Sequence, residues 1–203
     1  MFRQLHHMGI VVDDLEKARA VLGRGWGLKV NEDRTPGPDG ALDATVNARV
    51  LEFGIGQEFI RVFKPQDVSS PMGQFLQERP TGGAHHISLV SDTPEYDVTR
   101  LLAAGVKFWL PPDKKDWDGK SPIYFRPETT GGLVLQLWPE DNYVLSPQYR
   151  GEGIFSKLHH CGVAAQTLDI ARNFWVKTVG CSVDQRRSPV ETGRSTEIGR
   201  AHV

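Results

Sequence analysis

The stretch LHHMGIVVDDLEKARAVL at residues 5–22 decides the fold, because the chain repeats its layout twice more. AHHISLVSDTPEYDVTRLL spans 84–102, and LHHCGVAAQTLDIARNFW spans 158–175. Each copy has two adjacent histidines, an apolar run, a polar break and then apolar residues at helical spacing. The sequence therefore predicts three copies of one strand–helix unit.

A helix-starting residue stands seven positions after the second histidine of each copy. These residues are Asp14, Thr93 and Thr167. Their side-chain oxygens can accept hydrogen bonds from the first amides of a helix, which have no partner within the helix itself. We therefore expect the three helices to begin at equivalent places.

Strand-forming segments follow the first two predicted helices. ARVLEFGIGQEFIRVFKP at 48–65 and PIYFRPETTGGLVLQLWP at 122–139 each predict two strands joined by a turn that contains glycine. We therefore predict an α+β fold, in which paired βαβββ modules form a cup-shaped mixed sheet with the helices outside.

The repeats also divide the chain. Residues 1–140 are predicted to form a complete two-module domain, followed by a linker at 141–153 that contains proline and glycine. Residues 154–183 begin a third module that stops before its hairpin. Residues 184–203 fit no periodic pattern, and we expect a flexible or artefactual tail there.

The composition excludes several classes of protein. The chain has 203 residues, 39% of them hydrophobic, and a net charge of −1, so we expect no nucleic-acid partner. No apolar run approaches the length of a membrane span, and we expect no membrane partner. Two cysteines do not make a disulfide scaffold, so a reducing cytoplasm is the expected compartment.

Alternation along the strands places four polar side chains in the cup. Met8, Ile10 and Val12 form the apolar face of the first strand, which leaves His7 on the concave face. The same alternation places His86 of the second module there, together with Arg61 from the last strand of the first module and Gln136 from the last strand of the second.

Three of these side chains can donate lone pairs to a metal. The imidazoles of His7 and His86 and the amide oxygen of Gln136 suit a divalent ion and leave coordination positions open. We predict such an ion, drawn from Co, Mn, Fe, Zn and Ni. The first histidines of the pairs, His6 and His85, are expected to be structural or rim residues, as is His159.

The repeated layout resembles the vicinal oxygen chelate superfamily of glyoxalases, epimerases and extradiol dioxygenases. The opening LHHMGIVVDDLEKA at 5–18, SPMGQFLQERPTGGAHHISLVSD at 70–92 and GGLVLQL at 131–137 are most similar to the methylmalonyl-CoA epimerases. The resemblance covers roughly 5–139. It implies a metal site of two histidines plus a glutamate or glutamine from each of the two hairpins.

Two positions depart from that family pattern. Gln136 stands where the epimerases usually have glutamate, and Arg61 stands at the fourth ligand position. A guanidinium stays protonated and has no lone pair to give. Arg61 therefore either pairs with an anionic substrate beside a three-ligand metal, or binds a carboxylate or enolate at a site without metal. Glu58 is a substitute ligand only if it turns to the other face.

Three functions remain open on the sequence, and the resemblance implies a small-molecule substrate or ligand for each. The first is a metal-assisted epimerase or isomerase acting next to a carbonyl of an acyl-CoA-like substrate, with Gln136 and Arg61 in its active site. The second is an extradiol dioxygenase, which the third repeat and His160 suggest. The third is a metal-free binding protein of the same fold, favoured by Arg61. By analogy with two-module members, a homodimer is expected.

Overall fold

A computed structural model describes residues 2–109, 117–140, 143–150, 155–183 and 201–202. The predicted tail at 184–203 lies outside the described residues except for 201–202, and part of the predicted linker, at 141–142 and 151–153, lies outside them as well. Within the described residues, no helix is long and apolar enough to cross a membrane.

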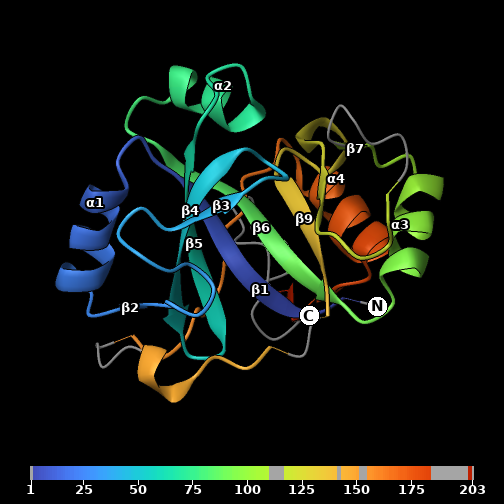
Figure 1. The fold of residues 1–203 in the computed structure, drawn as a ribbon. Helices are drawn as coiled ribbons and strands as arrows, with labels where there is room; N and C mark the ends of the chain where they lie inside the picture. Colours follow the sequence, from blue (N-terminus) through green and yellow to red (C-terminus); the bar gives the residue numbers. More distant parts are fainter. Residues whose placement is uncertain (1, 110–116, 141–142, 151–154, 184–200, 203) are drawn as a thin grey trace, which may run out of the picture.

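A mixed sheet organises the first two repeats (Figure 1). Its strands run in the order β2-β4-β5-β1-β6-β9-β8-β7, and β3 pairs with β4 at the side. Their bounds are β1 Phe2–Val11, β2 Lys29–Val30, β3 Ala41–Asp43, β4 Ala48–Ile55, β5 Glu58–Pro65, β6 Gly83–Ser91, β7 Phe108–Trp109, β8 Ile123–Phe125 and β9 Val134–Pro139.

The two modules meet along the centre of this sheet. Strands β1 and β6, which carry the first two histidine pairs, lie antiparallel to each other. On their outer sides, β1 pairs in parallel with β5, and β6 pairs in parallel with β9. The arrangement on one side of the seam therefore repeats on the other, as the predicted α+β fold of paired modules requires.

The three repeat helices begin where the sequence predicts. Asp14 caps α1 (Leu15–Ala18), which continues as the π-helical η1 (Arg19–Gly25). Thr167 caps α4 (Leu168–Arg172), which continues as the π-helical η4 (Asn173–Val179). Thr93 occupies the N-cap of α3 (Pro94–Ala103), but its side chain makes no capping hydrogen bond.

The remaining helical segments lie in connections. They are α2 (Pro71–Glu78), capped by Ser70, and the 3₁₀ turns η2 (Pro127–Thr129) and η3 (Pro147–Tyr149). The segment 143–150, predicted as linker, packs on the first module, since Leu145 is buried and the Tyr149 hydroxyl lies 3.0 Å from Asp33 Oδ1.

Apolar side chains divide between the two faces of the sheet as alternation predicts. Ile60 and Val62 of β5 pack with Leu15 and Leu22 in a cluster beneath the first helix. Phe63 of β5 belongs to a separate cluster on the cup side. The face of β5 that carries Arg61 is therefore the concave one.

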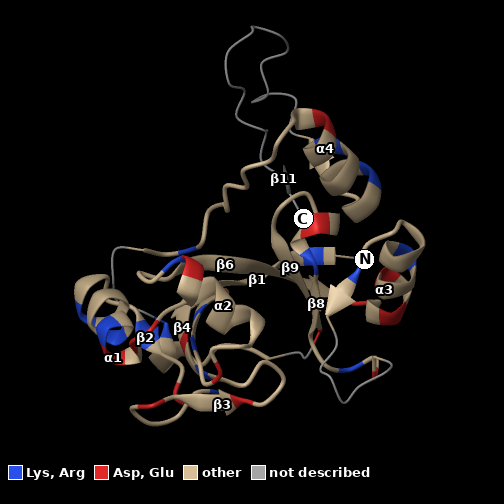
Figure 2. Cartoon of the chain, turned by 90° about the horizontal axis from the view of Figure 1, so that it is seen from above, with Lys and Arg blue, Asp and Glu red and all other residues tan. Residues whose placement is uncertain are grey.

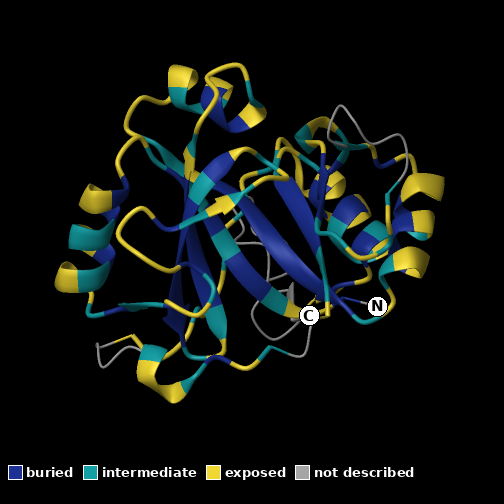
Figure 3. Ribbon diagram, viewed as in Figure 1, coloured by how far each residue is buried: buried dark blue, intermediate teal, exposed yellow. Residues whose placement is uncertain are grey.

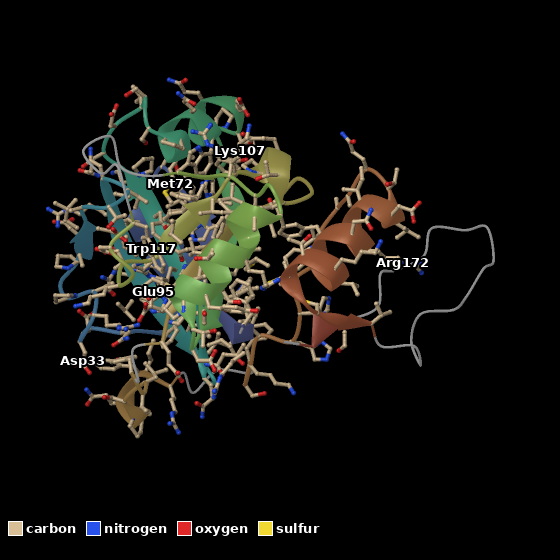
Figure 4. The ribbon with its side chains drawn as sticks, turned by 90° about the vertical axis from the view of Figure 1, so that its right-hand side faces the viewer. Asp33, Met72, Glu95, Lys107, Trp117 and Arg172 are labelled. Carbon is tan, nitrogen blue, oxygen red and sulfur yellow. The ribbon has the colours of Figure 1, made fainter. Side chains whose placement is uncertain are left out.

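The third repeat packs differently from the first two. Its helix, α4 with η4, stands to one side of the two-module sheet, as the position of Arg172 shows (Figure 4). Phe174 and Val179 join the core cluster that includes Leu101 of α3, and Arg100 donates hydrogen bonds to the carbonyls of Thr178 and Val179.

The strand predicted at the start of the third repeat does not form. Residues 158–164 have no strand structure, whereas the equivalent segments of β1 and β6 each pair on both sides. A strand holds its shape through hydrogen bonds to neighbours, and this segment pairs with no strand among the described residues. Among the described residues after 150, strand pairing within this region joins β10 (Ser182–Val183) with β11 (Ala201–His202).

Candidate active site

His7 and His86 meet at the centre of the cup, as the repeat predicts. Their Nε2 atoms lie 3.1 Å apart, although the residues come from different modules. Both side chains are buried, with 0% and 1% of their surface exposed. Strand β6 is buried over most of its length, and β1 is buried around its two histidines (Figure 3).

Small residues make room for the two imidazoles. Gly9 stands opposite both Arg61 and His86 in the sheet, and a Cβ added at Gly9 would lie 2.0 Å from Cε1 of His86. The imidazole of His86 therefore lies across β1 above Gly9. Ser88 holds the equivalent place between His7 and Gln136.

Burial keeps both central imidazoles neutral. The pKa of His7 and the pKa of His86 are well below the usual histidine value, first because burial disfavours the charged form. The positive charge of Arg61 lowers both pKa values further. Each neutral ring has one N–H and one nitrogen lone pair, and in this structure both nitrogens of each ring contact another histidine ring.

Arg61 is held in the cup by a buried carboxylate. Its Nε lies 3.3 Å from Oε2 of Glu52, which stands directly opposite it on β4 and is 1% exposed. Asp43 of β3 approaches the same guanidinium at 3.9 Å. The aromatic rings of Phe63 and Trp138 lie 5.3 and 5.1 Å from the guanidinium carbon.

The segment between β2 and β4 covers this ion pair. Asn31 donates a 2.7 Å hydrogen bond to Oε1 of Glu52 and accepts one of 3.0 Å from the Tyr143 hydroxyl. Arg34 lies 3.8 Å from Glu52 and 4.0 Å above the Tyr143 ring. Figure 2 shows β3 on the face of the sheet opposite α4.

The buried polar atoms of the cup that make no hydrogen bond to any described residue include Nε and Nη1 of Arg61, Oγ of Ser88, Oε1 of Gln136 and the hydroxyl of Tyr124. Native proteins rarely leave such atoms unsatisfied, so a cluster of them indicates a place for an ion, a water or a ligand. Nearby, burial raises the pKa of Tyr124 above its usual value, and Asp43 adds to the effect.

The donors fit a divalent ion with three protein ligands. The Nε2 atoms of His7 and His86 are 3.1 Å apart, which is close enough for one ion to bind both. The unsatisfied Gln136 oxygen supplies the third lone pair. The described residues contain no cluster of three histidine, cysteine, aspartate or glutamate ligands, so an ion held by His7 and His86 would take its third donor from a group of another kind, such as the amide of Gln136.

His6 and His85 do not lie where strand alternation places them. Their Nδ1 atoms contact Nδ1 of His7 at 2.7 Å and Nδ1 of His86 at 3.1 Å. Irregularities in the β1–β6 register fall at both residues and turn their rings toward their neighbours. The expectation that they are only structural or rim residues therefore missed their contact with the site. His6 also stacks on Trp138, with ring centroids 4.3 Å apart.

The remaining candidates lie elsewhere. His159 and His160 are exposed and contact each other. Glu58 stands opposite Ile55 at the end of the β4–β5 hairpin and does not approach the imidazole pair. The sequence analysis missed Glu52, Asn31 and Arg34. Of these, Glu52 had a signal, because a hairpin that pairs residues 55 and 58 also pairs residues 52 and 61.

Comparison with known proteins places this geometry in a family. Residues 4–137 match the model of the glyoxalase/bleomycin resistance protein/dioxygenase superfamily. The chain is 29% identical over 134 residues to human mitochondrial methylmalonyl-CoA epimerase, covering 66% of this chain and 72% of that protein. It is 27% identical over 138 residues to ethylmalonyl-CoA/methylmalonyl-CoA epimerase of Cereibacter sphaeroides, covering 68% and 98%.

Solved structures share the fold. A methylmalonyl-CoA epimerase in complex with methylmalonyl-CoA and NH4+ aligns with a TM-score of 0.55 at 18% identity, over 72% of this chain and 100% of that one. The epimerase of Mycobacterium tuberculosis aligns with a TM-score of 0.52 at 20% identity, over 71% and 89%. The predicted resemblance and fold class are confirmed, and the expectation of an enzyme agrees with these relatives.

Proposed function

Because the chain belongs to the glyoxalase/bleomycin resistance protein/dioxygenase superfamily, we propose that it is a metal-assisted epimerase or isomerase. It acts on the carbon next to the thioester carbonyl of an acyl-CoA. One observation carries the proposal: two repeat-equivalent imidazoles converge, with Nε2 atoms 3.1 Å apart, beside the unsatisfied oxygen of Gln136. The epimerase relatives supply the choice of reaction.

Three residues would hold the ion. His7, His86 and Gln136 offer neutral donors, and a bound divalent cation supplies Lewis-acid polarisation of the substrate carbonyl. The three donors leave coordination positions open for substrate oxygens. The metal therefore needs no further ligand from Arg61.

Arg61 binds the free carboxylate of the substrate. Its Nη1 is buried without a hydrogen-bond partner among the described residues, and Glu52 holds the other side of the guanidinium. Arginine recognises carboxylates through a planar set of donors. The favoured substrates are acyl-CoA thioesters that carry a second carboxylate, like the methylmalonyl-CoA named for the relatives.

Asp43 is the carboxylate that we assign to the α-proton. Glu52 is fully occupied by Arg61 and Asn31, whereas Asp43 is partly exposed and reaches Arg61 only at 3.9 Å. A substrate carboxylate that pairs with Arg61 leaves Asp43 free to accept a proton. Asp43→Asn should stop proton exchange and leave metal affinity unchanged.

Deuterium exchange tests the proposal. Methylmalonyl-CoA incubated in D₂O with the full chain and Co²⁺ should exchange its α-proton, followed by mass spectrometry. His86→Ala should abolish both the exchange and Co²⁺ binding, whereas His160→Ala should change neither. Oxygen uptake with catechols in place of exchange would instead identify a dioxygenase.

A second substrate tests the role of Arg61. Propionyl-CoA lacks the second carboxylate, so the wild-type chain should prefer methylmalonyl-CoA. A charged hydrogen bond contributes about 1.5–3 kcal/mol, so Arg61→Gln should reduce this preference by about 10-fold to 150-fold. An unchanged preference would contradict the assigned role of Arg61. Because Arg61 repels a cation, the same variant should bind Co²⁺ more tightly.

A further inference from the structure

The first histidine of each buried pair is the extra residue of a β-bulge. In the register between β1 and β6, Leu5 pairs with Leu89 and His7 pairs with Ser88, which leaves His6 without an opposite residue. On the other strand, Gly9 pairs with His86 and Ile10 pairs with Ala84, which leaves His85 in the same position. The two bulges thus occupy equivalent places in the two modules.

These bulges permit a contact that a regular strand forbids. Neighbouring residues of a strand point to opposite faces, yet His6 touches His7 and His85 touches His86 through their Nδ1 atoms. Bulges redirect side chains and occur often beside active sites. Both outer rings are buried, and His85 is further held edge-on against Phe75, with ring centroids 5.0 Å apart.

The contacts constrain which nitrogen of each central ring carries a proton. A neutral imidazole has one N–H donor and one acceptor nitrogen. If Nε2 of His7 gives its lone pair to an ion, its proton is on Nδ1, where the nearest acceptor is Nδ1 of His6 at 2.7 Å. The same assignment holds for His86 and His85 at 3.1 Å.

We infer that His6 and His85 are positioning residues that orient the metal-binding histidines. Each accepts the Nδ1–H of the histidine that follows it, which directs the Nε2 lone pair of that histidine into the cup. This inference rests on the proposed metal site. Partners that hold a metal-bound histidine typically change metal affinity by about 10-fold to 100-fold when removed.

Co²⁺ binding to the full chain provides the test. His6→Phe and His85→Phe keep an aromatic ring and remove the acceptor, so each should weaken Co²⁺ binding in calorimetry by about 10-fold to 100-fold and alter the Co²⁺ absorption spectrum. His85→Asn keeps an acceptor and should recover most of the affinity and the wild-type spectrum. His159→Phe, in the exposed pair of the third repeat, is the matched control and should behave as wild type.

The possible failures are distinguishable. If His6→Phe and His85→Phe bind Co²⁺ as tightly as wild type with an unchanged spectrum, the positioning role is wrong and the metal site stands. If the wild-type chain binds no Co²⁺, the metal site and the positioning role are both wrong. If it binds Co²⁺ but does not exchange the substrate proton, only the proposed reaction is wrong. Urea midpoints of each variant identify effects that come from unfolding.

Discussion

The histidine pairs in β1 and β6 and the pair at 159–160 share a motif and an Nδ1–Nδ1 contact within each pair, but they differ in their surroundings. His7 and His86 are buried and face each other across the seam of the sheet. His159 and His160 are exposed, in a segment without strand structure. The comparison teaches that the double histidine makes a candidate site only where two modules pair their central strands.

Removing the charge of a buried residue near the first two histidine pairs should have the largest effect on the free energy of unfolding. Glu52→Gln keeps the shape of the side chain and leaves the buried guanidinium of Arg61 without its carboxylate. Breaking a buried ion pair from one side costs about 3–5 kcal/mol of unfolding free energy. Urea denaturation of the variant measures the loss.

An exposed ion pair serves as the control for that measurement. Arg126 and Glu128 lie 3.9 Å apart with 46% and 58% of their side chains exposed. Glu128→Gln should change the unfolding free energy by at most about 1 kcal/mol. Equal losses in the two variants would contradict the view that the cup is a low-dielectric site.

Acid should destabilise the buried pairs. Burial, with a smaller contribution from Arg79, lowers the pKa of His85 from 6.5 to about 4, so the unfolded chain takes up a proton at a higher pH than the folded one. The contribution of neutral His85 to the stability of the folded chain is therefore complete above pH 6.5 and is lost as the pH falls towards 4. It amounts to about 3 kcal/mol, and the lowered pKa values of His7 and His86 act in the same direction.

Denaturation with urea at pH 7, 5.5 and 4.5 measures this dependence. His85→Gln removes the titrating group and should flatten the decline between pH 6.5 and 4. A variant that loses stability with acid as steeply as wild type would show that the effect comes from other groups.

Glycine substitution gives a smaller and more local test. Gly9 and Gly162 both stand two residues after the second histidine of their pairs. A Cβ at Gly9 collides with His86, whereas one at Gly162 meets nothing within 4 Å. Gly9→Ala should therefore cost about 1–3 kcal/mol in urea denaturation and weaken Co²⁺ binding, and Gly162→Ala should do neither.

Substitutions at the helix N-caps should change stability least, and by similar amounts in the first and third repeats. Asp14 and Thr167 both accept backbone hydrogen bonds at the N-cap. Asp14→Ala and Thr167→Ala should each weaken their helix by about 1 kcal/mol, measured by hydrogen exchange of its amides. Unequal values would show that the third repeat differs in its helix as well as in its strand.

Periodic features of the fold and the site could be predicted from the sequence. Strand alternation correctly placed Ile60 and Val62 on the face opposite Arg61, and the repeat correctly brought His7 and His86 together. Both predictions were possible because they depend only on spacing along the chain. The bulges at His6 and His85 could not be predicted, since the extra residue is visible only against the partner strand. Arg34 and Asn31 come from an aperiodic segment that reaches Glu52 only through tertiary packing.

Arg61 and Gln136 stand at equivalent places in the two hairpins, opposite Gly9 and Ser88 respectively. If the two modules carried identical side chains, a ligand could bind the cup in two equivalent orientations. Because one half carries the cation of Arg61 and the other the amide of Gln136, the proposed substrate, with one free carboxylate, would bind in a single orientation. The duplicated module thus supplies a symmetric sheet, and the difference between Arg61 and Gln136 makes the cup asymmetric.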